Sequence, residues 1–400
     1  MPVMSDPTAL IDERLDRLVS EADPTAVSQE EFRGLQYDLG LAWVHFPEGR
    51  GGLGVAPGLQ RRVDDCLRDA GARPAGSRHF FGLAMAGPVV VTHGTDAMKD
   101  RLLRRMFTGE DAWCQLFSEP GAGSDLAGLA CRAVRDGDEW VITGQKVWNT
   151  LAHVADRGML VARTDPEAPK HKGLTYFGLD MHAPGVEVRP LRQITGEAEF
   201  NEVYITEVRV PDADRIGEIG EGWRVAMTTL MNERTTIGGG SGAPERGSGP
   251  IAEAVRIWQE EAPSHEAPAK DRLMRMWIEA EALRLTNLRA SANRKAGNPG
   301  PEGSIAKLMF AEVNKRIYEL CLDLLGPAAM VGYDFTMKRA ENLGLVGPPG
   351  WSRKMFLRSR ANSIEGGTSE IQRNILGERV LGLPGDVRVD KDLPWSKVPR

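Results

Sequence analysis

The sequence predicts an α+β multidomain protein in which a helical region, a strand-rich region and a second helical region follow one another. Apolar residues recur at helical spacing before residue 113 and again from residue 222 onward. Between these regions, short runs of β-branched and aromatic residues are separated by Gly, Pro or charged turns. Four hundred residues suits two or three domains. We expect a helical domain at 1–113, a β domain at 114–217, a helical domain at 218–385 and a polar, irregular tail at 386–400.

The N-terminal region is expected to be a set of helices with one glycine-rich loop. Apolar residues at helical spacing mark the first helix, namely Leu10, Ile11, Leu15 and Leu18. Further helices are expected at residues 32–39, 59–70, 80–91 and 96–106. The stretch Phe46–Gly54 is expected to be a loop because it is rich in glycine.

The middle region is expected to be a compact β domain. Its strand-like segments are residues 139–144, 158–163, 174–180, 185–191 and 200–211. They are short, and each is bounded by turn-forming residues.

The C-terminal region is expected to form a helical bundle. Its helical patterns cover residues 224–237, 251–260, 271–296, 304–325, 352–361 and 369–381. One apolar face of the long helix at 271–296 is formed by Met274, Ile278, Leu285, Leu288 and Ala292. One face of the next helix is formed by Ile305, Met309, Val313, Ile317, Leu320 and Leu324. Long amphipathic helices of this kind bury such faces against one another.

Composition excludes several classes of function. The net charge of −6 gives no reason to expect nucleic-acid binding. Four widely spaced cysteines favour reduced thiols and a cytoplasmic location, and the seven histidines show no metal-ligand spacing. The N-terminus lacks the basic and apolar regions of a signal peptide, and no apolar run approaches the roughly 20 residues that span a membrane.

The most informative stretch runs from Trp113 to Thr150. Its first part packs Ser118–Asp125, S-E-P-G-A-G-S-D, into a loop whose glycines and serines expose N–H groups and hydroxyls. Its second part, G-Q-K-V-W-N-T, places the flat ring of Trp148 beside the hydroxyl of Thr150. Such a set suits a large, flat, hydrogen-bonding cofactor. The alternative is a surface turn followed by an ordinary hairpin, because small-residue loops are common.

Two glycine clusters superficially match the G-x-G-x-x-G fingerprint of dinucleotide-binding folds. The first begins at Gly121 but has Leu126 in the sixth position, and the second, Gly238–Ala243, follows a helix rather than a strand. The fingerprint requires a strand, a tight turn and a helix in that order. We therefore set both aside.

Three segments in order resemble the signature segments of the acyl-CoA dehydrogenase family: S-E-P-G-A-G-S-D, G-Q-K-V-W-N-T, and G-G-T-S-E-I-Q-R at Gly366–Arg373. The resemblance covers nearly the whole chain. It implies a helical N-terminal domain, a middle β-barrel and a C-terminal four-helix bundle. It also implies that bound FAD oxidises an acyl-CoA thioester to 2-enoyl-CoA: a carboxylate removes the α proton while a hydride passes to flavin N5. Implied partners are an electron-transfer flavoprotein and further copies of the chain in a homodimer or homotetramer.

The resemblance also assigns cofactor-binding residues. Those assigned to FAD are Leu116, Phe117, Ser118, Gly123, Ser124, Trp148, Asn149, Thr150, Thr368 and Glu370. Ser118 stands where the family more often has Thr, and Asn149 where it has Ile or Ser. Trp148 would pack against the isoalloxazine, and Thr150 would lie near N5. Ser124 would lie near the phosphates and the CoA arm. Without the resemblance, Trp148 would be interpreted as an ordinary residue of the β domain.

The catalytic base departs from the commoner family pattern. Most relatives carry it as a Glu at the position that Gly366 occupies here, and Glu365 lies one residue too early. A minority, resembling the isovaleryl and long-chain enzymes, carries it as the Glu of an E-R pair on a helix, which matches Glu233-Arg234. Gly366 would then offer its N–H to the thioester carbonyl. Arg234 has two possible roles, as a partner of Glu233 or of the CoA arm.

Helix geometry is compatible with Glu233 as the base. Trp223, Ala226, Met227, Leu230 and Ile237 form an apolar stripe. At about 100° per residue, Glu233 falls roughly 65° from the centre of this stripe, at its edge. A carboxylate there can reach a buried pocket. The alternative is a solvated Glu paired with a neighbour, which is the common situation of a helical Glu.

Two further departures concern contacts between subunits. No R-x-F-G segment follows the first C-terminal helix, and the family's Q-x-x-G-G is replaced by Asp323–Pro327, D-L-L-G-P. These changes keep open a subunit of a heteromeric dehydrogenase, and an oxygen-using acyl-CoA oxidase-like enzyme is a second alternative. Because Gly366 leaves space beside the α carbon, we expect a branched or bulky acyl group.

Overall fold

The structure is a computed structural model of the 400-residue chain. It describes residues 6–237, 245–261, 267–295, 300–331, 336–342, 350–387 and 389–399. For residues 234–237, 261, 294 and 295 only the backbone is described. The expected glycine motif at 238–243 lies outside the described residues.

The N-terminal region consists of helices with side-chain caps. The α-helices are α1 (Pro7–Glu21), α2 (Gln29–Asp38), α3 (Gln60–Asp69), α4 (Gly87–His93) and α5 (Asp96–Thr108). Asp6, Ser28 and Thr95 accept hydrogen bonds from backbone N–H groups in the first turns of α1, α2 and α5. The helix expected at 80–91 is confirmed as a continuous run of helical backbone, with a π-helical segment, Gly82–Ala86, directly before α4. Pro88 in the first turn of α4 cannot donate a backbone hydrogen bond, which accounts for the local change in helix type.

The middle region is one mixed sheet. Its strands are β1 (Trp113–Leu116), β2 (Arg132–Asp136), β3 (Glu139–Lys146), β4 (Arg157–Arg163), β5 (Leu174–Asp180), β6 (Val186–Pro190), β7 (Asn201–Pro211) and β8 (Arg215–Ile216). The strand order is β6-β7-β3-β2-β4-β5-β8, and β1 pairs in parallel with β4. The five strands expected from the sequence are confirmed, while β2 was missed because four of its five residues are exposed or charged.

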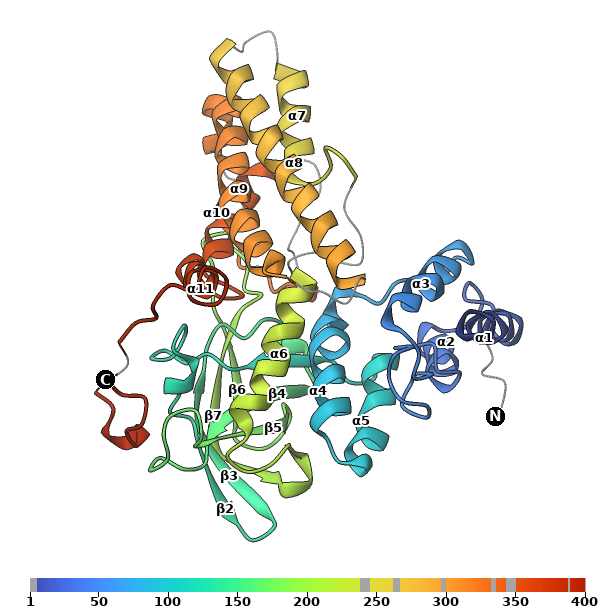
Figure 1. The fold of residues 1–400 in the computed structure, drawn as a ribbon, viewed down its shortest axis with the longest axis vertical. Helices are drawn as coiled ribbons and strands as arrows, with labels where there is room; N and C mark the ends of the chain where they lie inside the picture. The colour runs from blue at the N-terminus through green and yellow to red at the C-terminus, as the bar shows by residue number, and fades with distance from the viewer. Residues whose placement is uncertain are drawn as a thin grey trace.

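Both faces of the sheet are buried near its centre. Alternate residues such as Leu160 and Phe177 enter a core that strands β1 to β5 and β7 share. The intervening residues, such as Val161 and Tyr176, pack against a second core that includes α4, α5 and the helix that follows the sheet. Figure 1 shows these helices lying across one side of the strands. The sheet therefore supports the helices that pack on this face.

The C-terminal helices divide into two groups. They are α6 (Gly222–Ile237), α7 (Pro250–Glu261), α8 (Ala267–Lys295), α9 (Glu302–Leu325), α10 (Ser352–Ser359) and α11 (Ser369–Ile375). Helix α6 lies against the sheet, whereas α7, α8, α9 and α10 share one core and project away from it (Figure 1). The apolar face predicted for residues 305–324 is confirmed, because Val313, Ile317 and Leu320 are buried in this core.

The apolar face predicted to bury the long helix α8 is wrong for this chain. Met274, Ile278, Leu285 and Leu288 are 49%, 63%, 51% and 40% exposed, and Ala292 is exposed as well. The helix instead buries Leu273, and packs Trp277 and Ala280 against the core. Helix α8 thus has apolar residues on two faces, and helical periodicity alone could not distinguish the inner from the outer one.

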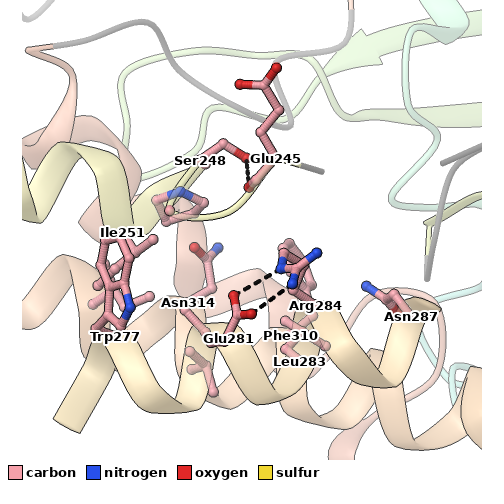
Figure 2. Close-up of a pocket in the computed structure, with 16 residues that line it drawn as sticks. Glu245, Ser248, Ile251, Trp277, Glu281, Leu283, Arg284, Asn287, Phe310 and Asn314 are labelled. Atoms are coloured by element: carbon pink, nitrogen blue, oxygen red, sulfur yellow. Dashed lines mark hydrogen bonds and ion pairs between the residues drawn. The ribbon is translucent and has the colours of Figure 1, made fainter. Parts of the chain in front are cut away.

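A cavity of about 180 Å³ lies inside the bundle between α7, α8, α9 and residues 245–251 (Figure 2). An ion pair between Glu281 and Arg284 lines it, and so do the side chains of Trp277 and Asn314. None of the residues predicted to hold cofactor or substrate is among its lining residues. The cavity is therefore separate from the predicted cofactor and substrate residues, and exposed residues such as Glu245 and Ser248 form part of its wall.

One carboxylate joins three strands at the far end of the sheet. Asp212, directly after β7, accepts hydrogen bonds from Trp140 Nε1 of β3 (2.8 Å) and from Arg215 of β8 (2.8 and 3.2 Å). The Arg215 hydrogen bond, assisted by that of Trp140, lowers the pKa of Asp212 to about 2. The folded state therefore favours the ionised carboxylate.

This shift predicts an acid-sensitive contribution to stability. Because the folded pKa lies below the unfolded value, the contribution is present above about pH 4 and is lost as pH falls toward 2. We expect Asp212→Asn to lower the free energy of unfolding by roughly 1–2 kcal/mol at pH 7 and by much less near pH 2. Urea unfolding across this range measures the difference, and a difference that does not change with pH would contradict the assignment.

Candidate active site

The loop after β1 is closed by a buried carboxylate. Glu119 accepts hydrogen bonds from the backbone N–H groups of Ala130 (2.7 Å) and Cys131 (2.9 Å) and from Lys146 Nζ (2.8 Å). Two backbone hydrogen bonds between Glu119 and Ala122, both 3.0 Å, tighten the turn. The loop therefore has one conformation fixed from its inner side.

Lys146, the last residue of β3, is fully buried and connects three segments. Its ammonium donates to Glu119, to the carbonyl of Phe117 (3.0 Å) and to the carbonyl of Val161 on β4 (2.8 Å). These three acceptors use all three N–H bonds of the ammonium. A buried ion pair is tolerated when its remaining hydrogen bonds are satisfied in this way.

The tip of the loop is exposed to solvent. Gly121, Gly123 and Ser124 are exposed, and a Cβ atom built on either glycine would meet nothing within 4 Å. The predicted Gly123 and Ser124 therefore lie on an open surface. Leu116 and Phe117 are buried, so any contact that they make with a cofactor would come from the backbone.

The second segment, Val147–Leu151, is hydrogen-bonded to the first. Val147 N–H donates to the Ser118 carbonyl (2.9 Å), and Asn149 Nδ2 donates to the Gln115 carbonyl (2.8 Å). Two backbone hydrogen bonds also pair Asn149 with Asn201 at the start of β7 (3.0 and 3.1 Å). The two segments predicted to hold one cofactor thus form one connected unit.

Trp148 has an unusual conformation and an unusual exposure. Its φ is 62°, that of Leu151 is 56°, and only three non-glycine residues of the described chain have positive φ. Such backbone outliers cost of order 1–3 kcal/mol and cluster at functional sites. The indole is nevertheless 59% exposed and touches Phe200 edge-on. The protein therefore holds a large aromatic face open to solvent.

These features fit a flavin. In the same hydrogen-bonded unit as Trp148, Ser118 and Thr150 are half-buried and Asn149 is buried. The side-chain oxygen of Asn149 is buried without a hydrogen-bond partner in the structure. An aromatic face, two hydroxyls and a free acceptor match a flat ring system that has N–H and carbonyl groups on its edge.

The third segment contains a tight turn at Gly366 and Gly367. Their φ angles are 63° and 91°, a region that favours glycine, and a Cβ on Gly367 would lie 2.7 Å from Gln372 Nε2. Thr368 caps α11 by accepting from Ile371 N–H (3.1 Å). Glu370 is exposed. The turn is therefore fixed by the helix that follows it.

Two buried cations hold this turn in place. Lys307 of α9 donates to the carbonyls of Asn362 (2.8 Å) and Gly367 (2.6 Å). Arg358 of α10 binds both carboxylate oxygens of Glu365 (3.1 and 2.9 Å) and also Glu199 (3.1 Å). The carbonyl of Glu199 accepts from Leu151 N–H (2.8 Å), so the third segment is tied to the second.

Comparison with known proteins shows to which family the chain belongs. Residues 114–208 match the model of the acyl-CoA dehydrogenase middle domain, and residues 220–381 match that of its C-terminal domain. The acyl-CoA dehydrogenase IpdE1 of Mycobacterium tuberculosis is 37% identical over 352 residues, covering 87% of this chain and 86% of that protein. The chain belongs to the acyl-CoA dehydrogenase family. This family of oxidoreductases is the one that the three sequence segments resemble.

Other relatives differ in length or are assemblies. The acyl-CoA dehydrogenase FadE34 of M. tuberculosis is 37% identical over 364 residues, but this chain spans only 47% of its length. The ChsE4-ChsE5 complex from M. tuberculosis is similar with a TM-score of 0.68 at 27% identity, covering 96% of this chain and 100% of that one. A variant of the Tcur3481-Tcur3483 steroid ACAD has a TM-score of 0.68 at 25% identity, covering 95% of this chain and 100% of that one.

Neither a membrane span nor a metal cluster was found in the described part of the chain. Among its helices, none has the length and apolar character that crossing a bilayer requires. No group of three or more His, Cys, Asp or Glu in the same ranges is placed to hold a metal ion.

The two candidate bases of this dehydrogenase have different environments. Glu365 is bound by Arg358 on both oxygens and by Asn362 Nδ2 (2.8 Å), so its carboxylate stabilises the turn. Glu233 is half-buried on α6. Burial lowers the pKa of Lys307, and the negative charges of Glu365, Glu233 and Glu312 oppose this shift. Glu233 therefore lies within electrostatic range of the cation that holds Gly367.

The buried face of α6 includes part of the predicted stripe, since Ala226 is in the core and Trp223 and Leu230 pack against it, but it extends further round the helix. Gly222, Val225, Ala226 and Thr229 are the buried residues of its first half, and the Thr229 hydroxyl meets Tyr176 OH of β5 (3.0 Å). At about 100° per residue, Glu233 lies within roughly 30° of the centre of this face rather than at its edge. The side chain of Arg234 lies outside the described residues.

Sequence reasoning missed the residues that assemble the site. Glu119 lies inside the first signature segment and Lys146 inside the second. The only sequence signal for their ion pair was a single Lys at the end of a strand. Lys307, Arg358 and Glu199 lie outside all three segments. Their role depends on contacts between residues that are distant in the sequence.

Proposed function

We propose that the chain is an FAD-dependent dehydrogenase that converts a bulky acyl-CoA thioester to the 2-enoyl-CoA, with Glu233 as the base. The supporting observation is that the three signature segments are hydrogen-bonded into one unit around the exposed Trp148. Bound FAD supplies the two-electron oxidant that accepts the β hydrogen as hydride. The residues that would hold FAD are Ser118, Gly123, Ser124, Trp148, Asn149, Thr150, Thr368 and Glu370, with Leu116 and Phe117 contributing backbone groups.

Glu233 would remove the α proton of the substrate. Its position on the buried face of α6 allows bound substrate to exclude water, and desolvation raises the pKa of a carboxylate and makes it a stronger base. The negative charge of Glu233 is one of those that oppose the lowering of the Lys307 pKa by burial.

Gly366 would stabilise the negative charge that develops on the thioester oxygen. Its N–H belongs to a turn that Lys307 and Arg358 fix, so the donor is preorganised. The absence of a side chain at Gly366 leaves room beside the α carbon. This supports a branched or bulky acyl group, and the similar structure described as a steroid ACAD supports a steroid-type one. Ser124 and Arg234 would meet the CoA arm.

The proposal predicts the behaviour of Glu233→Gln. Without oxygen, the parent protein should lose its flavin absorbance when a bulky acyl-CoA is added. The variant should bind FAD but lose this absorbance about 10²- to 10⁴-fold more slowly, which is the usual contribution of a general base. Stopped-flow absorbance measures the rate.

Glu187→Gln is a matched control, because Glu187 is an exposed residue of β6 that pairs with Arg189. It should react at the parental rate. If Glu233→Gln also reacted at the parental rate, the base would have to be another residue. In air, formation of peroxide in proportion to product would favour the oxygen-using alternative over transfer to an electron-transfer flavoprotein.

Exposed apolar residues on the outer face of α8 support an interface with a second chain. Met274, Ile278, Leu285 and Leu288 form an apolar strip that this chain leaves exposed. The similar structures include two assemblies named by two components, ChsE4-ChsE5 and Tcur3481-Tcur3483. We therefore propose that a second chain of the same fold packs on this face. This chain is either another copy of the protein or a related subunit.

Charge placed on this strip should separate the chains. We expect Ile278→Glu to shift the protein from an oligomer to a monomer, because a buried unpaired carboxylate is costly. Light scattering after size exclusion measures the mass. Lys270→Glu, on an exposed position of the same helix, serves as the control. A parent protein that is monomeric and colourless would instead favour the heteromeric subunit, whereas a stable oligomer unchanged by Ile278→Glu would contradict this interface.

A further inference from the structure

The C-terminal segment 389–399 returns to the sheet domain. Trp395 N–H donates to the Ala168 carbonyl (3.0 Å), and Ser396 N–H donates to the Pro166 carbonyl (2.9 Å). A β-bridge also pairs Pro169 with Pro394. Figure 1 shows this last part of the chain beside the sheet and away from the bundle. The segment therefore has a defined docking site, although its sequence is polar and irregular.

Trp395 packs on Arg163, which binds the end of the loop after β1. We call this loop, residues 117–131, the cofactor loop. The guanidinium of Arg163, the last residue of β4, lies 4.3 Å from the centre of the Trp395 ring. Arg163 is buried and donates to the carbonyls of Ala127 (2.6 Å) and Leu129 (3.1 Å). Trp395 Nε1 donates to the carbonyl between them, that of Gly128 (3.1 Å). Three successive carbonyls are thus held by this stacked pair.

A bridging lysine connects the same segment to the loop tip. Lys170 Nζ lies 3.0 Å from Asp125, which ends the S-E-P-G-A-G-S-D stretch, and 2.9 Å from Asp390. Burial alone would lower the pKa of Lys170, but hydrogen bonds to Asp390 and Asp125 outweigh it and raise the pKa. The ammonium therefore stays charged and links the C-terminal segment to the tip.

The cofactor loop is consequently held at two ends by different parts of the chain. Glu119 and Lys146 fix its beginning. Arg163 and Trp395 fix its end at residues 127–129. Between them lies the exposed tip with Gly123 and Ser124, whose position depends on both anchors.

We propose that segment 389–399 is a positioning element for the cofactor loop, with Trp395 as its main anchor and Asp390 as a second one. The inference rests on the proposed function, in which this loop meets the FAD phosphates. Loss of the anchor should let the loop sample other conformations, so that binding FAD must first reorder it. The affinity for FAD then falls without loss of any residue that touches the cofactor.

The test compares point variants of the full-length protein. Calorimetric titration of FAD into apoprotein gives the dissociation constant, and limited proteolysis reports cleavage within residues 118–131. We expect Trp395→Ala to raise the dissociation constant about tenfold or more and to speed this cleavage. Trp395→Phe keeps a ring over Arg163 and should have a smaller effect. Asp390→Asn should raise the constant severalfold.

Val389→Ala is the matched control, because Val389 is 85% exposed in the same segment. It should bind FAD like the parent. The proposal is overturned if Trp395→Ala, and Asp390→Asn as the milder variant, bind FAD with parental affinity. If the parent itself binds no FAD, the proposed function fails instead, and cleavage that is no faster in the variants would then overturn the positioning role separately.

Discussion

The buried ion pair between Lys146 and Glu119 is the interaction on which the rest of the site depends. It joins the loop after β1 to the end of β3, and Lys146 reaches β4 as well. Removing one partner of such a pair leaves an uncompensated buried charge and typically costs about 3–5 kcal/mol. The two signature segments are therefore a single structural unit, since each supplies one half of the pair. The strained backbone at Trp148 directly follows this anchor, which explains how its conformation is maintained.

A second charged cluster bears on the proposal that the base is Glu233 of α6. Arg358 is buried between Glu199 and Glu365 and joins the C-terminal turn to the sheet. Both carboxylate oxygens of Glu365 bind Arg358, and Gly366 has no side chain. The charges of Glu233 and Glu312 also act on Lys307, and of these two residues Glu233 is the one on the helix packed against the sheet. Gly366 has no side chain beside this cluster, so the proposed base and the proposed bulky acyl group would have one structural origin.

The sequence predicted local structure and the identity of the segments well, but not the contacts between them. The strand at 174–180 was predicted to the residue, because its two buried faces make it continuously apolar. Strand β2 was missed because its exposed residues are charged. The expectation of a barrel and a bundle came from the family resemblance.

The pairings Arg358–Glu199 and Lys307–Gly367 join residues 159 and 60 positions apart, a distance over which periodicity carries no information. Trp395 was unremarked because a single Trp in a polar tail has no pattern. The outer face of α8 was assigned to the core because helical periodicity is the same for an exposed and for a buried apolar face.

The claim that the Lys146–Glu119 pair shapes the flavin site is tested most directly by the affinity of Lys146→Met for FAD. The measurement is a calorimetric titration at a temperature at which parent and variant are both folded by circular dichroism, beside the double variant Glu119→Gln/Lys146→Met. We predict one FAD per chain for the parent and at least about tenfold weaker binding for Lys146→Met. The double variant should regain fold stability relative to the single variant but not affinity. Parental affinity in a folded Lys146→Met protein would contradict the account.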